Sequence, residues 1–154
     1  MRFTVAAVGK PRDAALAAAI REYETRASRY WPLAFVEVRE EPARGRRADD
    51  VRAREGARLL DAVPKGARVW ICDAGGPVRT SEQFAALLTK QREAAQDVAF
   101  LLGGAYGLDT SLRERPAGVL SLGAMTFPHE LARLMLAEQL YRAGTIVRGE
   151  PYHK

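Results

Sequence analysis

The side chains that can exchange protons near neutral pH are concentrated at the C-terminal end of the chain. Both histidines of the protein, His129 and His153, lie in the stretch 126–154. Histidine takes up and releases a proton near neutral pH, so it suits general acid–base chemistry. Between them, Glu138 and Arg142 are spaced i, i+4 in the order that favours an ion pair on a helix. This stretch is therefore the first candidate for the chemistry of the protein.

The residues around this ion pair predict one long helix from Pro128 to about Gly144. Pro128 suits a first helical turn because its missing N–H would have no helical partner there, and Gly144 is a natural stop. Two opposite sides of the helix are apolar, formed by Leu131, Leu134 and Met135 on one stripe and by Leu136, Leu140 and Ala143 on the other. We therefore expect the helix to pack between its own sheet and a second subunit. The ion pair shares the first stripe and should be partly shielded from water, either as a structural pair that orients a dimer contact or as part of a site.

Length and composition predict a single domain. The chain has 154 residues, of which 47% are hydrophobic, and this is enough to bury a core in one domain spanning residues 1–154. It carries 24 Lys and Arg against 19 Asp and Glu, a net charge of +5. A basic balance suggests an anionic partner such as nucleic acid, although many basic proteins bind none.

Several classes of protein are disfavoured by the sequence. The only cysteine, Cys72, excludes an intramolecular disulfide, and no Cys/His cluster suggests a metal site. The longest uncharged run, Val98–Leu108, is far shorter than the ~18 apolar residues that a membrane-spanning helix needs. The apolar start Phe3–Val8 is too short for a signal-peptide core. We therefore expect a soluble, cytoplasmic protein with no metal and no membrane partner.

Strand-like and helix-like segments alternate along the chain. The expected strands are Arg2–Val8, Leu33–Val38, Arg68–Asp73, Val98–Leu102 and a short last one at Gly118–Leu120. The expected helices cover about residues 14–28, 49–63, 81–94 and the C-terminal stretch, with at most a short helix at 109–115. This alternation predicts an α/β fold with a mostly parallel sheet.

Small residues follow three of the expected strands, in the segments 72–76, 102–105 and 121–127. Ligands of parallel α/β sheets bind outside the carboxyl ends of the strands, and small residues let a ligand approach the backbone closely. None of the segments has the acid pairs or Ser/His/Asp order of a hydrolase. The pattern Gly103-Gly104-x-x-Gly107 lacks the spacing of a dinucleotide fingerprint or a P-loop. Each segment alone fits an ordinary tight turn, but the three together, beside an ionisable tail, favour a binding site.

Three longer strings resemble a known family. They are FLLGGAYGL (Phe100–Leu108), LSLGAMTFPHELARLMLAEQLYRA (Leu120–Ala143) and the ending PYHK (Pro151–Lys154). Together with the N-terminal RFTVAAVGK and the chain length, they resemble the ribosomal large-subunit pseudouridine methyltransferase H family, the single-domain branch of the SPOUT methyltransferases. The resemblance covers essentially the whole chain. One departure is Gly123, where the family more often has serine, so a contact there would use the backbone in place of a side-chain hydroxyl.

The resemblance implies an α/β knot, in which the C-terminal segment is threaded through a loop as a deep trefoil. It also implies a homodimer that binds S-adenosylmethionine and methylates N3 of a pseudouridine in 23S ribosomal RNA of the assembled ribosome. The residues that match the family's cofactor-binding segments are Cys72, Asp73, Gly103, Gly104, Leu122, Gly123, Ala124, Met125, Thr126 and Phe127. Those that match positions linked to substrate binding and methyl transfer are Glu138, Arg142, Tyr152 and His153.

Methyl transfer to a ring nitrogen suggests roles for these last four side chains. Before N3 attacks, its proton must be removed or its developing anion stabilised. His153 is a candidate base and Glu138 a second, Arg142 would stabilise negative charge on the base, and Tyr152 would stack on the extruded nucleotide. Without the resemblance, a C-terminal Tyr-His-Lys predicts a frayed tail. His129 is interpreted as a helix-start residue that makes a structural contact.

Other interpretations stay open beside the leading one. A non-catalytic, ribosome-binding knotted protein would keep the same fold, whereas a Rossmann-type nucleotide enzyme is disfavoured by the late and wrongly spaced glycines. The loop Arg44–Arg47 either contacts RNA phosphate or is a solvated surface loop. The C-terminal tail is a candidate to act in the pocket of the neighbouring chain.

Overall fold

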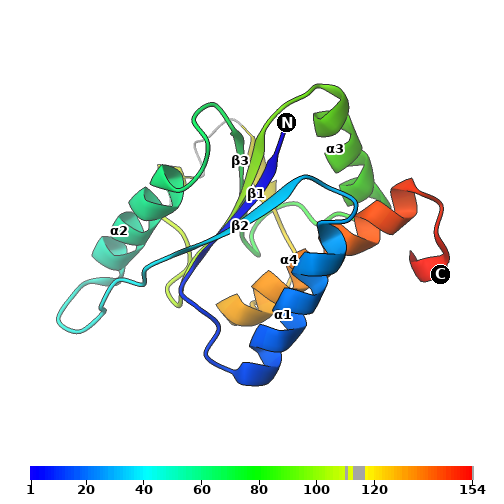
Figure 1. Ribbon diagram of the computed structural model, residues 1–154. Coiled ribbons are helices and arrows are strands. Elements are labelled where there is room, and N and C mark those ends of the chain that lie inside the picture. The colour runs from blue at the N-terminus through cyan, green and yellow to red at the C-terminus, as the bar shows by residue number, and fades with distance from the viewer. Residues whose placement is uncertain (110, 113–116, 154) are drawn as a thin grey trace.

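A five-stranded parallel sheet forms the centre of the computed structural model, which describes residues 1–109, 111–112 and 117–153 (Figure 1). The strands are β1 (Phe3–Val8), β2 (Leu33–Val38), β3 (Arg68–Cys72), β4 (Val98–Leu102) and β5 (Gly118–Leu120). They pair in the order β2-β1-β4-β3-β5, and every described strand pair is parallel. The carboxyl ends of the strands therefore lie along one edge of the sheet, and the α/β prediction is confirmed.

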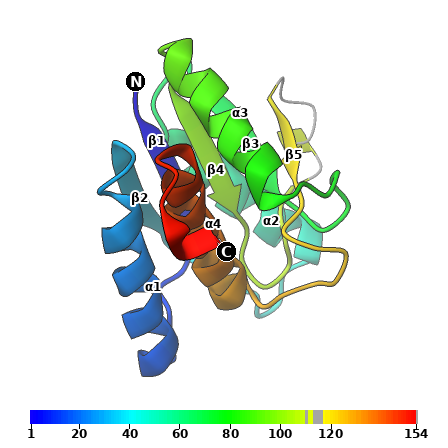
Figure 2. The same ribbon diagram turned by 90° about the vertical axis from the view of Figure 1, so that its right-hand side faces the viewer.

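Helices cover both faces of this sheet. They are α1 (Ala14–Ala27), α2 (Ala48–Asp61), α3 (Ser81–Glu93) and α4 (His129–Val147), followed by a 3-10 helix at Pro151–His153. Figures 1 and 2 show α1, α3 and α4 on one face, with α4 between the other two, and α2 on the opposite face. None of the described helices is long and apolar enough to cross a membrane.

The alternation of side chains along β1 divides the core into two layers. Phe3 and Val5 belong to the layer beneath α1, α3 and α4, whereas Ala6 and Val8 belong to the layer beneath α2. The first layer also contains, from α3 and α4, the side chains of Phe84, Leu88, Leu136, Leu140 and Ala143. Because both faces are covered, β1 and β4 are buried along their whole length.

Most predicted elements are confirmed to within about two residues, but the predicted end of α4 is wrong. The helix continues through Gly144 to Val147. Glycine is needed at position 144 for packing, because a Cβ there would collide with the ring of Tyr30, just after α1. The chain leaves the helix at Gly149, whose φ of +68° suits glycine at a helix end. The short helix predicted at 109–115 lies largely outside the described residues.

Candidate active site

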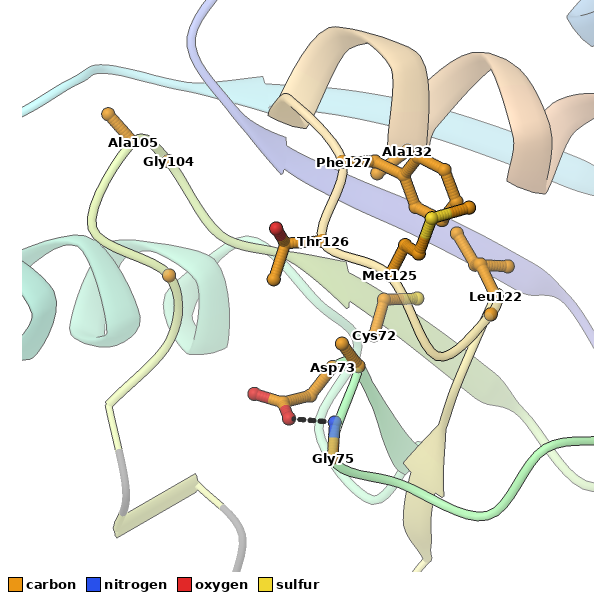
Figure 3. A pocket seen from close by; sticks show the side chains of 13 residues that line it. Cys72, Asp73, Gly75, Gly104, Ala105, Leu122, Met125, Thr126, Phe127 and Ala132 are labelled. Atoms are coloured by element: carbon orange, nitrogen blue, oxygen red, sulfur yellow. Dashed lines mark hydrogen bonds between the residues drawn. The ribbon is translucent and has the colours of Figure 1, made fainter.

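A pocket of about 470 Å³ lies at the carboxyl edge of the sheet. It forms where the segments that follow β3, β4 and β5 meet the start of α4 (Figure 3). Its lining residues are Cys72, Asp73, Ala74, Gly75, Gly104, Ala105, Gly107, Leu122, Gly123, Met125, Thr126, Phe127 and Ala132. Small-molecule sites have volumes of roughly 300–1,000 Å³. The three segments that the sequence singles out therefore build one pocket of suitable size.

Eight of the ten residues predicted to bind a cofactor line this pocket, and Gly103 and Ala124 do not. Gly103 packs against its own loop, because a Cβ at this position would lie 2.6 Å from the carbonyl carbon of Gly107. Ala74, Gly75 and Ala105 also line the pocket and lie in the strand-end segments that the sequence analysis singled out, whereas Gly107 and Ala132 lie outside those segments. Gly107 completes the glycine pattern after β4, so extending the segment 102–105 by two residues would have found it.

The glycine-rich loop after β4 is closed on itself. The Gly107 N–H donates to the Gly104 carbonyl at 3.0 Å. Gly107 has a φ of +78°, a conformation that side chains other than glycine rarely adopt. At Gly103 the close approach of Gly107 leaves no room for a side chain, and at Gly107 the backbone conformation disfavours one. The backbone of this loop can therefore approach a ligand directly.

Short-range hydrogen bonds fix the other two segments. The Asp73 carboxylate accepts the Gly75 N–H at 2.8 Å (Figure 3). The Ser121 hydroxyl donates to the Gly123 carbonyl at 2.9 Å and accepts the Gly123 N–H at 3.2 Å. A Cβ at Gly123 would lie 3.4 Å from the Phe127 ring. The hydroxyl that holds this turn thus comes from Ser121, two residues before Gly123.

The side chains of the pocket are mostly apolar. Cys72, Leu122, Met125 and Phe127 lie close together on one side, and the Asp73 carboxylate lies below them (Figure 3). Burial, with a smaller contribution from Asp73, raises the pKa of the Cys72 thiol to about 12. The thiol therefore stays protonated at neutral pH and acts as wall surface, because the thiolate is the nucleophilic form of cysteine.

The predicted ion pair on α4 is confirmed, and it holds the C-terminal tail. Arg142 Nε donates to Glu138 Oε1 at 2.9 Å, and the two side chains are only 27% and 18% exposed. The Tyr152 hydroxyl donates to the same Glu138 oxygen at 3.1 Å and lies 3.3 Å from the Tyr23 hydroxyl. The Arg142 guanidinium lies 4.9 Å from the centre of the Tyr152 ring. The tail is therefore packed on α4, and a frayed tail is not what the structure shows.

His153 does not join this cluster. Its Nε2 lies 2.5 Å from the Glu82 carboxylate at the start of α3. Backbone N–H donation at the start of α3, then the Thr80 hydroxyl and His153, lower the pKa of Glu82 to about 2. The structure thus brings three of the four predicted catalytic residues together and places the fourth against α3. His129, the first residue of α4, lies outside the lining of this pocket, and its Nε2 is buried without a hydrogen-bond partner among the described residues.

None of the four predicted catalytic residues lines the pocket of its own chain. Their partners Tyr23, Glu82 and Tyr141 were missed by the sequence analysis. Tyr23 and Glu82 are 129 and 71 residues away from their tail partners, so no local spacing could have indicated them. Tyr141, whose ring centre lies 4.6 Å from that of Tyr152, is a neighbour of Arg142 that the helical pattern did not single out.

The arginine-rich loop before α2 is partly committed to an internal contact. Arg46, Arg54 and Arg58 all approach the Glu41 carboxylate, which is 3% exposed. The hydrogen bond from Arg58, supported by the charges of Arg46 and Arg54, holds the pKa of Glu41 below its usual value. Arg47 stays 81% exposed. Arg46 of the predicted loop is therefore structural, whereas Arg47 is exposed to solvent, 3.7 Å from the exposed Asp49 carboxylate.

The chain is similar to known proteins over its whole length. Residues 1–153 match the family model described as "Predicted SPOUT methyltransferase". Proteins named ribosomal RNA large subunit methyltransferase H are 56% identical in Gemmatimonas aurantiaca, over all of both chains, and 44% identical in Geobacter metallireducens, over 99% of each. A crystal structure of TrmJ from Z. mobilis ZM4, 18% identical, superposes with a TM-score of 0.51 over 91% of this chain and 69% of that one, and so shares the fold. The chain therefore belongs to the SPOUT methyltransferases, in the family of the ribosomal RNA large subunit methyltransferase H proteins.

Proposed function

We propose that the protein transfers a methyl group from S-adenosylmethionine to N3 of a pseudouridine in 23S ribosomal RNA, on the assembled ribosome in the cytoplasm. The observation that carries the proposal is the single pocket built by three strand-end segments, because its small residues expose backbone to a nucleoside-containing cofactor. The names of the relatives support the choice of ribosomal RNA as substrate.

The residues of the pocket fit S-adenosylmethionine. Cys72, Leu122 and Phe127 offer apolar surface to a purine ring. The segment 122–127 offers backbone N–H and C=O groups to the polar edge of that ring, which explains why small side chains suffice. The Asp73 carboxylate in the same wall suits the positive charge and the hydroxyl groups of this cofactor.

The chemistry left to the protein is positioning and proton removal. The cofactor supplies a methyl group already activated by a sulfonium, so the chain has to align the acceptor and exclude water. Glu138 and His153 are the groups that can accept the N3 proton. Arg142 would stabilise negative charge on the ring oxygens, and the Tyr152 ring offers a face on which the extruded base can stack. Burial and the neighbouring Tyr23 raise the pKa of Tyr152, so its hydroxyl stays protonated.

In this proposal the protein is a homodimer in which the tail of each subunit serves the pocket of the other. The tail cluster is separate from the pocket of its own chain. On the outer stripe of α4, Leu131 is 37% exposed and Met135 is half-buried, which leaves apolar surface for a subunit contact. We also propose that the segment after β5 is threaded through a loop to form the trefoil knot.

Two measurements test the reaction itself. Calorimetric titration with S-adenosylmethionine is expected to show binding, and no heat at about millimolar cofactor would remove the proposal. Labelled methyl incorporation is then compared among assembled ribosomes, free large subunits, naked ribosomal RNA and ribosomes whose target is uridine. We expect incorporation only where the ribosome is assembled and the target is pseudouridine. Equal incorporation into naked RNA would contradict the ribosomal substrate.

A mixing experiment tests which subunit supplies the tail. One partner carries Gly103→Val, which blocks the pocket loop, and the other is truncated after Gly149, which removes the tail. Each variant alone should be inactive. Mixed and allowed to exchange subunits, they regain activity if the tail acts in the neighbouring chain, because one pocket per heterodimer is then complete. A mixture that stays inactive while heterodimers form would show that each tail serves its own chain.

A further inference from the structure

We propose that Glu55 is a positioning residue for the glycine-rich loop of the pocket. This proposal rests on the proposed function, since the loop is taken to bind the cofactor. Glu55 lies in α2, on the face of the sheet opposite α4, and no motif of the sequence singles it out. Its carboxyl supports the loop at Gly104, so that the pocket-facing backbone is already in place when the cofactor arrives.

The carboxyl of Glu55 is buried and only half satisfied. The residue is 4% exposed, although glutamate is almost never fully buried without a partner. Its Oε1 accepts the Glu41 N–H at 3.0 Å. Its Oε2 has no hydrogen-bond partner among the described residues. One oxygen is thus tied to the connection between β2 and α2, and the other has no hydrogen bond within the part of the chain that the structure describes.

The second oxygen lies directly against the pocket loop. A Cβ built at Gly104 would lie 2.9 Å from Glu55 Oε2 and 3.0 Å from the Val8 Cγ1 atom. Both distances are shorter than ordinary van der Waals contacts, so the carboxyl occupies the space that a side chain at 104 would need. Gly104 itself lines the pocket. The backbone of residue 104 is therefore held between the pocket and the buried carboxyl.

Two further residues of α2 contact the same stretch of chain. The Arg52 side chain donates to the Tyr106 carbonyl at 3.3 Å. A Cβ at Gly56 would lie 3.3 Å from Leu112 Cδ1 and 3.5 Å from Asp109 Cβ. Arg52 is 31% exposed and its bond is long, so it adds little rigidity. The contact of Glu55 lies between these two along α2, and it is the one that faces Gly104 itself.

The burial of a carboxyl at this place costs stability, and this cost is the reason to assign it a role. Burial, with the nearby Glu40 and Glu41 charges, raises the pKa of Glu55, whereas the Glu41 N–H and Arg58 act in the opposite direction. A buried polar atom without a partner is unfavourable, and an apolar side chain of similar size would fill the space at lower cost. Residues that lower stability in this way are found preferentially at functional sites.

The test combines substitutions on both sides of the contact. Binding of S-adenosylmethionine is measured by calorimetry for Glu55→Gln, Glu55→Ala, Gly104→Ala and the double variant Glu55→Ala/Gly104→Ala. We expect Glu55→Gln to bind within about threefold of the natural protein, because it keeps the shape and an acceptor for the Glu41 N–H. Glu55→Ala and Gly104→Ala should each bind about tenfold more weakly. The double variant should bind more tightly than Gly104→Ala alone, since the added methyl then enters vacated space.

A second readout needs no cofactor. Hydrogen exchange of the backbone amides of residues 103–108 should be faster in Glu55→Ala than in the natural protein and unchanged in Glu55→Gln. At saturating cofactor, kcat should stay near its natural value, because Glu55 touches neither the methyl group nor the acceptor base. Asp61→Ala, at the exposed end of the same helix, is the matched control and should change none of these quantities. If Glu55→Ala does not fold, Glu55→Asp, which shortens the side chain by one methylene, should show the same changes at smaller size.

The outcomes separate this proposal from the proposed function. Natural affinity and natural loop exchange in Glu55→Ala would overturn the positioning role. So would equal weakening by Glu55→Gln and Glu55→Ala, or a double variant no better than Gly104→Ala. If the natural protein bound no S-adenosylmethionine at all, the proposed function would fail, while the exchange measurement would still report whether Glu55 holds the loop.

Discussion

The pocket and the C-terminal tail are built in different ways. The pocket consists of backbone and small side chains from three segments, each directly following a parallel strand. The tail is held by long side chains that reach across the fold, with the Tyr152 hydroxyl near both Glu138 and Tyr23. The first arrangement is set by strand order and turn geometry. The second is set by which side chains meet when the helices pack.

This difference predicts that cofactor binding and methyl transfer respond to different substitutions. Added volume in the pocket should weaken cofactor binding, because the loops there have little free space. Lost polar groups in the tail should slow the methyl transfer while leaving cofactor affinity unchanged. Variants that mix the two effects would show that the two regions act as one unit.

Truncation after Gly149 is expected to have the largest effect. It removes Tyr152 and His153, and with them the stacking face and one candidate base. We expect the single-turnover rate of methyl transfer to fall by at least about 100-fold. Cofactor affinity measured by calorimetry should stay within about threefold. A truncated protein with a natural rate would remove the tail from the mechanism.

Gly103→Ala should produce the opposite pattern. A Cβ at 103 would lie 2.6 Å from the Gly107 carbonyl carbon, so the turn must open to accept it. We expect cofactor affinity to fall by about tenfold and stability by about 1–3 kcal/mol. The control is Gly45→Ala, where the φ of +72° disfavours alanine but nothing lies within 4 Å of the added carbon. That control should lose stability and keep its affinity, and equal loss of affinity in both variants would contradict the local explanation.

Glu138→Gln tests the tail without removing it. Glutamine keeps the size of the side chain, but the charged bond to Arg142 is lost and the acceptor for the Tyr152 hydroxyl is weakened. We expect the methyl-transfer rate to fall by about tenfold at unchanged cofactor affinity, measured in single turnovers over a range of pH. A natural rate together with a lower melting temperature would reduce the ion pair to a structural role.

The sequence analysis located the pocket better than the tail contacts, for a physical reason. The strand-end rule needs only the positions of strands, and apolar runs such as Val98–Leu102 indicate these well. It therefore found the segments that line the pocket, including Asp73 and Gly104. The Glu138–Arg142 pair was predictable because both residues lie on one helix, where spacing determines contact.

Contacts that depend on tertiary packing were not predictable from one sequence. Gly144 carried a local signal for a helix end, but the ring of Tyr30 decides its role and α4 continues past it. The contact of His153 with Glu82 joins residues 71 positions apart, and no local spacing indicates it. Glu55 gave no signal at all, because a glutamate within a charged helix normally faces solvent, and only the fold shows that it is buried beneath the pocket loop.

The smallest expected effects concern the pH dependence of stability. The contribution of a carboxyl to stability should fall with rising pH at the pocket loop and rise with pH at the tail. On the pocket side, burial raises the pKa of Glu55 from its usual value of 4.5. The folded state then binds this proton more tightly than the unfolded state, so stability falls as pH rises from about 4.5 to the raised folded value. Glu55→Gln has no such proton. Its melting temperature relative to the natural protein should therefore increase across this range and level off above it.

On the tail side, the pKa of Glu82 is lowered to about 2, mainly by backbone N–H donation at the start of α3. Its contribution is fully present above about pH 4.5 and is lost as pH falls toward about 2. Glu82→Gln should therefore melt slightly below the natural protein at neutral pH, by no more than about 2 °C because the pair with His153 is exposed. As pH rises, the melting temperature of Glu82→Gln should therefore fall relative to the natural protein, whereas that of Glu55→Gln should rise relative to it. If the two melting-temperature differences changed with pH in the same direction, the pKa of each carboxyl would not be set by its own surroundings. The contrast between the supported loop and the exposed tail contact would then fail.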